Sequence, residues 1–195
     1  MNEKRNFRRV YRFFRPLIKL IFPFSMEGRE NIPEGPALLC ANHSSMFDPL
    51  LITLSMDCHD FHRHLAKVEC NKIPLIGWMM RKSGTIFVRR DGSDMDSVRA
   101  CLKALGNGDK LMIFPEGTRV KEGESVEPKS GAVYLAVRRQ VPLVPIYVPR
   151  KKKLFRPVRV RVGQPYIPSA DRNADMTALA QDLMARIEAL GAVND

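Results

Sequence analysis

The stretch ALLCANHSSMFDPLLITLSM, residues 37–56, contains two apolar runs separated by a polar loop. ALLCAN (37–42) predicts a buried strand, because a short apolar run that ends at turn-forming residues is typical of one. Asp48 can cap a helix, and Pro49 suits a helix's first turn, so LLITLSM (50–56) is expected to be helical. The stretch therefore predicts a strand, a polar loop and a helix in that order.

Alternating strands and helices are expected along the rest of the chain. Strands are predicted at 63–67, 85–90, 110–114, 141–148 and 158–163, and helices at 94–105, 130–139 and 173–190. Valines alternate with arginines in 158–163, which predicts one buried and one solvated face. The pattern places the chain in the α/β class, with a mixed, largely parallel sheet flanked by helices. Functional loops in such sheets follow strand ends, as NHSSMFDP and FPEGTR (114–119) do.

The composition excludes an integral membrane protein, because 27% of the 195 residues are charged. The formal net charge of +11 favours an anionic partner, such as nucleic acid, acidic lipid, a phosphorylated cofactor or an acidic carrier protein. The main domain has no aromatic–basic nucleic-acid motif, so no nucleic-acid partner is expected. Four cysteines form no CxxC pair, which favours a reduced, cytoplasmic compartment.

The N-terminal residues 1–24 are predicted to form an amphipathic, basic and aromatic helical segment at a membrane interface, ahead of a main domain at 25–195. Arginine and lysine alternate there with aromatic and aliphatic residues, which suits a helix lying among lipid headgroups. Pro16 and Pro23 are expected to kink or end its helices. The alternative is a helix that packs on its own domain with a solvated basic face.

The polar loop after the first strand contains a candidate general base, His43. Asp48 lies five residues later and can accept a hydrogen bond from the ring, which would fix its tautomer. A second interpretation remains open, in which Asn42, Ser44 and Asp48 are ordinary turn and capping residues. A serine nucleophile is not favoured, because the loop lacks a GxSxG elbow.

Two other segments have ambiguous patterns. CHDFHRH (58–64) and Cys70 offer possible zinc ligands, but their spacing matches no common zinc site, so a solvated loop and no metal are expected. IPLIGWMM (73–80) is apolar and suits an apolar groove, a membrane contact or a core segment equally well.

The loop FPEGTR follows another expected strand and forms a tight turn. Glu116 can hydrogen-bond a hydroxyl, and Arg119 can bind a phosphate through its planar guanidinium. Further cations are expected at strand ends or loop edges, namely Lys67, Arg89, Arg90 and Lys129. Together with the loop of His43, these residues predict a site for an anionic substrate.

HSSMFD (43–48) and FPEGTR together resemble the HxxxxD and FPEGTR motifs of the glycerolipid acyltransferases, and in particular those of lysophosphatidic acid acyltransferases. Further blocks follow in that family's order, namely MEGRENIPEGPALLCANHSS, KIPLIGWMMRKSGTIFVRR, KSGA and VPLVPIYV. The resemblance covers about residues 25–165, and two motifs in the right contexts are more specific than HxxxxD alone.

The resemblance implies that His43 deprotonates the sn-2 hydroxyl of a lysophospholipid, which attacks an acyl thioester directly without an acyl-enzyme. Asp48 would orient His43. The acceptor's glycerol phosphate would be bound by Glu116, Gly117, Thr118, Arg119, Arg90 and Lys67. Arg89 departs from the family pattern, where Asp or Asn is common. Backbone N–H groups of the turn at 43–45 are expected to stabilise the oxyanion.

The activity implied is that of a 1-acyl-sn-glycerol-3-phosphate acyltransferase, which makes phosphatidic acid from lysophosphatidic acid and acyl-CoA or acyl carrier protein. No metal or redox cofactor is expected. The expected partners include an anionic membrane surface, and the expected location is peripheral, on the cytoplasmic face of the cell membrane. Alternatives are acylation of glycerol 3-phosphate at sn-1 or of another lysophospholipid, and a non-catalytic module that binds anionic membranes.

Overall fold

The computed structural model describes residues 2–56, 60–89, 95–169 and 174–192, and its centre is a seven-stranded sheet in the order β1-β7-β6-β2-β5-β3-β4. The strands are β1 (Phe24–Glu27), β2 (Leu38–Ala41), β3 (His62–Lys67), β4 (Ile86–Val88), β5 (Lys110–Ile113), β6 (Leu143–Tyr147) and β7 (Val158–Val162). Neighbouring strands of the described sheet are parallel, except that β6 and β7 are antiparallel. The predicted α/β class with a largely parallel sheet is confirmed.

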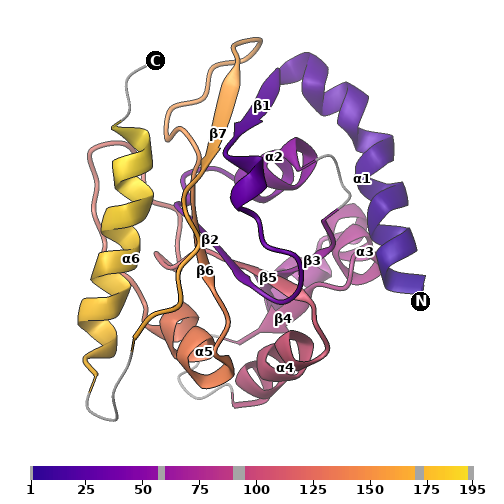
Figure 1. Ribbon diagram of the computed structural model, residues 1–195. Coiled ribbons are helices and arrows are strands. Elements are labelled where there is room, and N and C mark those ends of the chain that lie inside the picture. The colour runs from indigo at the N-terminus through magenta and orange to yellow at the C-terminus, as the bar shows by residue number, and fades with distance from the viewer. Residues whose placement is uncertain (1, 57–59, 90–94, 170–173, 193–195) are drawn as a thin grey trace.

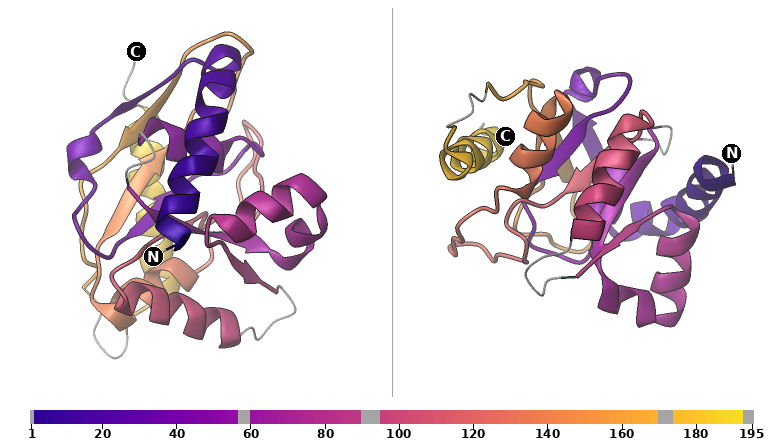
Figure 2. Two further views of the ribbon diagram at one scale, coloured as in Figure 1. Left: turned by 90° about the vertical axis from the view of Figure 1, so that its right-hand side faces the viewer. Right: turned by 90° about the horizontal axis from the view of Figure 1, so that it is seen from below.

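Helices cover both faces of the sheet (Figures 1 and 2). They are α1 (Asn2–Ile21), α2 (Asp48–Ser55), α3 (Pro74–Lys82), α4 (Met95–Gly106), α5 (Gly131–Arg139) and α6 (Met176–Gly191), with short 3-10 turns at Arg29–Asn31 and Val68–Lys72. One apolar core lies between the sheet and α1 and α2. A second core lies between the sheet and α4, α5 and α6. The expected strands and helices are present within a few residues, whereas β1 was not predicted.

The central strand β2 contributes to both cores. Leu39 and Ala41 face the core of α1 and α2, whereas Leu38 and Cys40 face that of α4, α5 and α6. All four side chains are fully buried, which explains why this segment is continuously apolar rather than alternating. The alternation predicted for β7 is confirmed, since its valines are buried and Arg159 is exposed.

Helix α1 packs one side against the sheet and leaves apolar residues on another side exposed. Phe7, Tyr11, Ile18 and Phe22 belong to the core, whereas Phe13, Leu17 and Leu20 are exposed. The helix continues through Pro16 and ends at Ile21, two residues before Pro23, so Pro16 does not end the helix, and the kink expected there stays a prediction. The lost backbone hydrogen bond is offset by the packing of the turns on either side.

None of the helices described combines the length and the apolar character that a bilayer-spanning segment needs. The segment IPLIGWMM contributes most of α3, in which Gly77 is the buried residue. Ile73, Leu75 and Trp78 are exposed, so its interpretation as a core segment is wrong.

The histidines of β3 are buried, so the predicted solvated loop is wrong for them. His62 Nε2 lies 2.9 Å from Thr53 Oγ1 of α2, and His64 Nε2 lies 2.9 Å from Tyr11 Oη of α1. Burial lowers the pKa of His64 to about 4 and the pKa of His62 well below its usual value of 6.5. These neutral rings are therefore polar links between β3 and the helices that cover it.

Acid is expected to destabilise the fold through this buried pair. Because both pKa values lie below those of the unfolded chain, unfolding takes up protons between about pH 6.5 and, for His64, about pH 4. The free energy of unfolding should fall by about 1.4 kcal/mol per pH unit for each proton taken up. Urea denaturation at pH 7 and pH 5 measures this loss. His64→Gln should lose less stability over that interval than the wild type, and an equal loss in both proteins would contradict the assignment.

Candidate active site

The two motif loops meet at the carboxyl ends of the neighbouring strands β2 and β5. Cys40 pairs with Ile113 in the register of the two strands, so the chain leaves both at the same edge of the sheet. The Val120 N–H donates to the carbonyl oxygen of His43 at 2.8 Å, which ties the loops together. The fold thus brings together two segments that are about 70 residues apart in the sequence.

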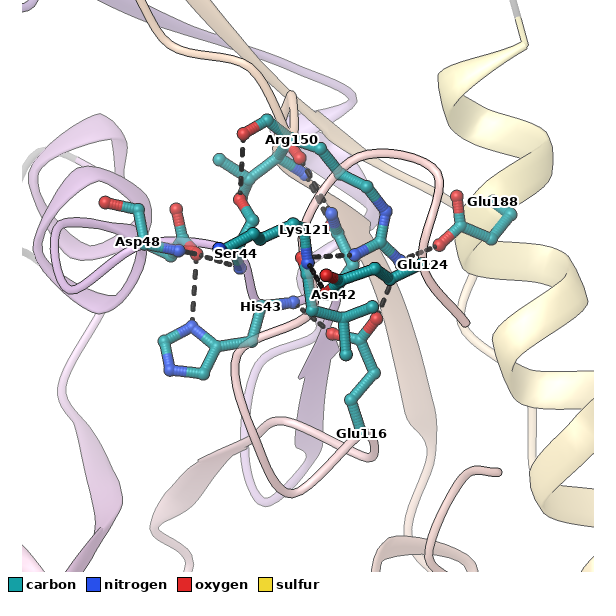
Figure 3. Close-up of polar contacts among 12 residues, drawn as sticks. Asn42, His43, Ser44, Asp48, Glu116, Lys121, Glu124, Arg150 and Glu188 are labelled. Atoms are coloured by element: carbon teal, nitrogen blue, oxygen red, sulfur yellow. Dashed lines mark hydrogen bonds and ion pairs between the residues drawn. The ribbon is translucent and has the colours of Figure 1, made fainter. Parts of the chain in front are cut away.

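The carboxylate of Asp48 lies at the centre of the first motif loop (Figure 3). Its Oδ2 lies 3.1 Å from His43 Nδ1 and accepts the N–H groups of Ser44 and Ser45, each at 2.7 Å. Asp48 is the first residue of α2, whose N-cap is Phe47, so its carboxylate turns back to the loop rather than capping the helix as expected. The capping role predicted for Asp48 is therefore wrong.

The charged form of Asp48 is stabilised by its donors. Burial alone would raise the pKa of this carboxyl, but hydrogen bonds from His43 and from Ser45, together with the ammonium of Lys152, hold its pKa below its usual value. Asp48 is therefore an anion at neutral pH, although it is fully buried.

The imidazole of His43 is oriented by contacts on its edge and on its face. Because Nδ1 faces a carboxylate, we assign the proton of the neutral ring to Nδ1, which leaves the lone pair on Nε2. The ring stacks on Phe114, with the ring centres 4.2 Å apart and the planes at 26°. Nε2 points away from Asp48 (Figure 3), so the arrangement can take a proton from a group outside the loop.

Glu116 of the second motif is buried and turned toward the first motif. Its Oε2 accepts the backbone N–H of His43 at 2.5 Å, and its Oε1 lies 2.6 Å from a guanidinium nitrogen of Arg150. Arg150 also donates to the Val120 carbonyl and pairs with Glu188 of α6. This network fixes both loops to the C-terminal helix (Figure 3).

Lys152 is a second cation that was not predicted as a site residue. Its Nζ lies 2.7 Å from Asp48 Oδ1 and 2.9 Å from Ser44 Oγ, and the side chain is only 5% exposed. Both Arg150 and Lys152 belong to the run PRKKK, which directly follows the predicted strand at 141–148. The position of this run at the end of a strand was the sequence signal for their role.

The expected oxyanion donors are occupied by carboxylates. The N–H of His43 donates to Glu116, and those of Ser44 and Ser45 donate to Asp48. The expectation that the turn at 43–45 offers its N–H groups to a substrate is therefore wrong. The two buried carboxylates need these donors, since a buried charge without hydrogen bonds is costly.

Four other predicted acceptor ligands lie along the same sheet edge, namely Gly117, Thr118, Arg119 and Lys67. Gly117 has a positive φ of 65°, and a Cβ there would lie 2.9 Å from Lys129 Cδ, so the turn requires glycine. Thr118 and Arg119 are exposed beside it. Lys67 is exposed at the end of β3 and pairs in register with Val88.

Glu116 has contacts within the protein, and three other predicted residues lie outside the described ranges. The carboxylate of Glu116 supports the His43 loop, and a contact of Glu116 with an acceptor stays a prediction. Arg90, Cys58 and His59 lie outside the described residues. In the described part of the chain, no group of three or more His, Cys, Asp or Glu residues is placed to bind a metal ion.

A comparison with protein families covers most of the sheet and both motif loops. The family model described as Acyltransferase matches residues 23–149. The chain belongs to the acyltransferase family. The family membership predicted from the two motifs is thereby confirmed, and both motif loops lie within the matched residues, whereas Arg150 and Lys152 lie just beyond them.

Named relatives of this acyltransferase include a chloroplastic 1-acyl-sn-glycerol-3-phosphate acyltransferase of Arabidopsis thaliana, which is 35% identical over 65% of this chain and 36% of its own length. The chain thus spans little more than a third of that relative. The 1-acyl-sn-glycerol-3-phosphate acyltransferase of Bacillus subtilis is 27% identical over 92% of this chain and 97% of its own length. The crystal structure of the 1-acyl-sn-glycerophosphate acyltransferase of Thermotoga maritima has the same fold, with a TM-score of 0.73 and 24% identity over 98% of this chain and 81% of that one.

Removing the guanidinium of Arg150 should destabilise this acyltransferase. Arg150→Met leaves the buried carboxylate of Glu116 without its cation, which should cost about 3 kcal/mol or more of unfolding free energy in chemical denaturation. Arg150→Met combined with Glu116→Gln should recover much of that loss. Arg99→Met breaks an exposed pair with Asp96 and should change stability little. Equal effects of the two arginine substitutions would show that the buried pair has no special role.

Proposed function

We propose that this acyltransferase transfers a fatty acyl group from an acyl thioester, acyl-CoA or acyl carrier protein, to the sn-2 hydroxyl of 1-acyl-sn-glycerol-3-phosphate, giving phosphatidic acid. The observation that carries the proposal is the His43–Asp48 pair, in which the carboxylate holds Nδ1, Nε2 points away from the carboxylate, and the ring stacks on Phe114 of the FPEGTR loop. The names of the Arabidopsis and Bacillus relatives support this choice of acceptor.

In the proposed mechanism, His43 Nε2 takes the proton of the acceptor hydroxyl as its oxygen attacks the thioester carbonyl. The charge of Asp48 stabilises the imidazolium that forms. The tetrahedral intermediate collapses by breaking the carbon–sulfur bond, and the thiolate takes up the proton from His43. The acyl group passes directly from sulfur to oxygen, so no acyl-enzyme forms and no metal or redox cofactor takes part.

The acceptor phosphate is assigned to the cations that follow the neighbouring strands. Arg119 lies beyond β5, and Lys67 lies at the end of β3, which is two strands from β2 and therefore about 10 Å from it. A headgroup lying across the end of β5 would have its hydroxyl near His43 and its phosphate near these cations. In this proposal Gly117 and Thr118 shape the loop, and Arg90 adds a further cation.

The enzyme is proposed to work peripherally on the cytoplasmic face of the cell membrane, where both its acceptor and its product reside. Support comes from α1, which exposes Phe13, Leu17 and Leu20 in addition to its arginines. A helix with apolar and cationic sides suits the interface of an anionic leaflet.

Replacing His43 by alanine should lower kcat for acyl transfer by a factor of about 10² to 10⁴, because the base is removed. The assay uses lysophosphatidic acid with acyl-CoA and with acyl carrier protein as donors, and unchanged thermal unfolding would show that the variant is folded. Glycerol 3-phosphate and other lysophospholipids are assayed in parallel, since the same base could activate their hydroxyls. Full activity of His43→Ala would refute the assignment, and a higher kcat/KM for another acceptor would reassign the substrate.

Lys152 is proposed as a positioning residue that acts through Asp48. Its ammonium balances part of the charge of the Asp48 carboxylate, which orients the His43 ring. The side chain also donates to Ser44 Oγ, so it holds the residue that directly follows the histidine. This role accounts for a buried lysine beside a carboxylate that already has three other donors.

Lys152→Met should lower kcat for acyl transfer with little change in KM, because Asp48 and Ser44 lose the ammonium that holds the loop of His43 in place. Lys152→Arg should recover most of the wild-type kcat, and Lys103→Met, which removes an exposed lysine of α4, should retain all of it. A Lys152→Met variant that is less stable but has an unchanged kcat would show that Lys152 is merely structural.

A further inference from the structure

The loop between β6 and β7, residues 148–157, has the sequence VPRKKKLFRP and exposes two large apolar side chains. Leu154 is 62% exposed and Phe155 is 67% exposed. Phe155 also has a positive φ of 60°, a backbone conformation that is strained for an aromatic residue. The loop thus presents two large apolar side chains to solvent, one of them from a strained backbone position.

Contacts connect this loop to the end of α1 and to the catalytic loop. The Phe155 N–H donates to the Ile21 carbonyl at 2.7 Å, and the adjacent Phe22 ring lies 5.3 Å from the Phe47 ring. Figure 1 and the left view of Figure 2 show the loop beside the C-terminal end of α1. Each of the three segments exposes large apolar side chains, which we together call the apolar rim, namely Leu20, Met46, Phe47, Leu154 and Phe155.

Cations flank the apolar rim. Lys151, Lys153 and Arg156 are exposed on the β6–β7 loop, and Lys19 is exposed in the last turn of α1. Apolar tips bordered by lysine and arginine match an anionic leaflet, in which phosphates lie just outside the acyl chains. This complementarity favours a lipid surface over a protein partner.

We propose that the apolar rim is a lipid-docking surface, on which the β6–β7 loop enters the interface of an anionic leaflet beside the end of α1. The proposal rests on the proposed function, because it assumes a lipid acceptor. Met46 and Phe47 lie between His43 and Asp48 in the sequence, so the docked leaflet would adjoin the catalytic loop. Lys152 holds Asp48 only two residues before Leu154, so the docking tip is anchored at the catalytic pair.

The test measures sedimentation with phosphatidylcholine vesicles that contain or lack phosphatidylglycerol. Leu154→Ser combined with Phe155→Ser should weaken binding to the anionic vesicles at least about tenfold. Combining Lys151→Gln, Lys153→Gln and Arg156→Gln should remove most of the preference for phosphatidylglycerol. Wild-type protein that ignores both vesicles, or a double serine variant that binds like the wild type, would overturn the proposal.

Ile167→Ser is the matched control, because Ile167 is 54% exposed but lies at the opposite edge of the sheet. The backbone of its neighbour Tyr166 forms hydrogen bonds with Leu143, the first residue of β6. The β6–β7 loop follows the last residue of β6, so the two sites lie at opposite ends of this strand. This variant should bind vesicles like the wild type. An equal loss in this control would show that any exposed apolar residue contributes, which would also overturn the proposal.

Activity measurements distinguish a failure of docking from a failure of the proposed function. With a short-chain lysophosphatidic acid dissolved as monomers, the double serine variant should turn over like the wild type, whereas with acceptor in vesicles it should be at least about tenfold slower. If the wild type acylates neither acceptor but its vesicle binding is lost in the double variant, the proposed function fails and the docking surface stands. If the double serine variant turns over the dissolved acceptor more slowly than the wild type does, the substitutions have damaged the catalytic site, and a docking role is overturned.

Discussion

The buried negative charge of Asp48 is the constraint on which the active-site loop depends. A carboxylate out of contact with water is stable only if cations and hydrogen-bond donors surround it. Here the donors come from the two residues after His43, from the His43 ring and from Lys152 of a remote loop. The contacts that stabilise this one carboxylate therefore fix the backbone of the first motif, the orientation of the His43 ring and the position of the β6–β7 loop.

The buried carboxylate of Glu116 in the second motif also needs hydrogen-bond donors and a cation. Its carboxylate takes the His43 N–H and the Arg150 guanidinium, and Arg150 continues the connection to α6. The HxxxxD and FPEGTR loops are thus coupled by charges inside the protein as well as by strand pairing. The arginine and threonine of FPEGTR remain at the surface, which separates the part of the motif that supports the site from the part available to a substrate.

The sequence predicted those features that depend on apolar periodicity or on turn chemistry. Strands β2 and β7 and helix α4 were predicted because the burial of their side chains follows a regular pattern. In β2 the apolar run is continuous, in β7 apolar and charged residues alternate, and in α4 the apolar residues have helical spacing. The inward histidines of β3 were missed, because polar side chains that bond to Thr53 and Tyr11 leave no apolar signal. Lys152 was missed because a run of three lysines does not show which one is buried. The motif residues were found by type, but the direction in which Glu116 and the N–H groups point depends on contacts with residues far away in the sequence.

Because β6 and β7 are antiparallel, the loop that joins them within the described sheet can change in length and sequence more freely than the other connections. Parallel neighbours must be joined by a crossover that packs on a face of the sheet, so altering such a connection disturbs a core. A return to an antiparallel neighbour needs only a surface loop. The tip of residues 148–157 could thus be lengthened, shortened or recharged without repacking a helix, provided that Arg150 and Lys152 keep their partners. In this architecture, the surface around the catalytic loop can diversify independently of the chemistry.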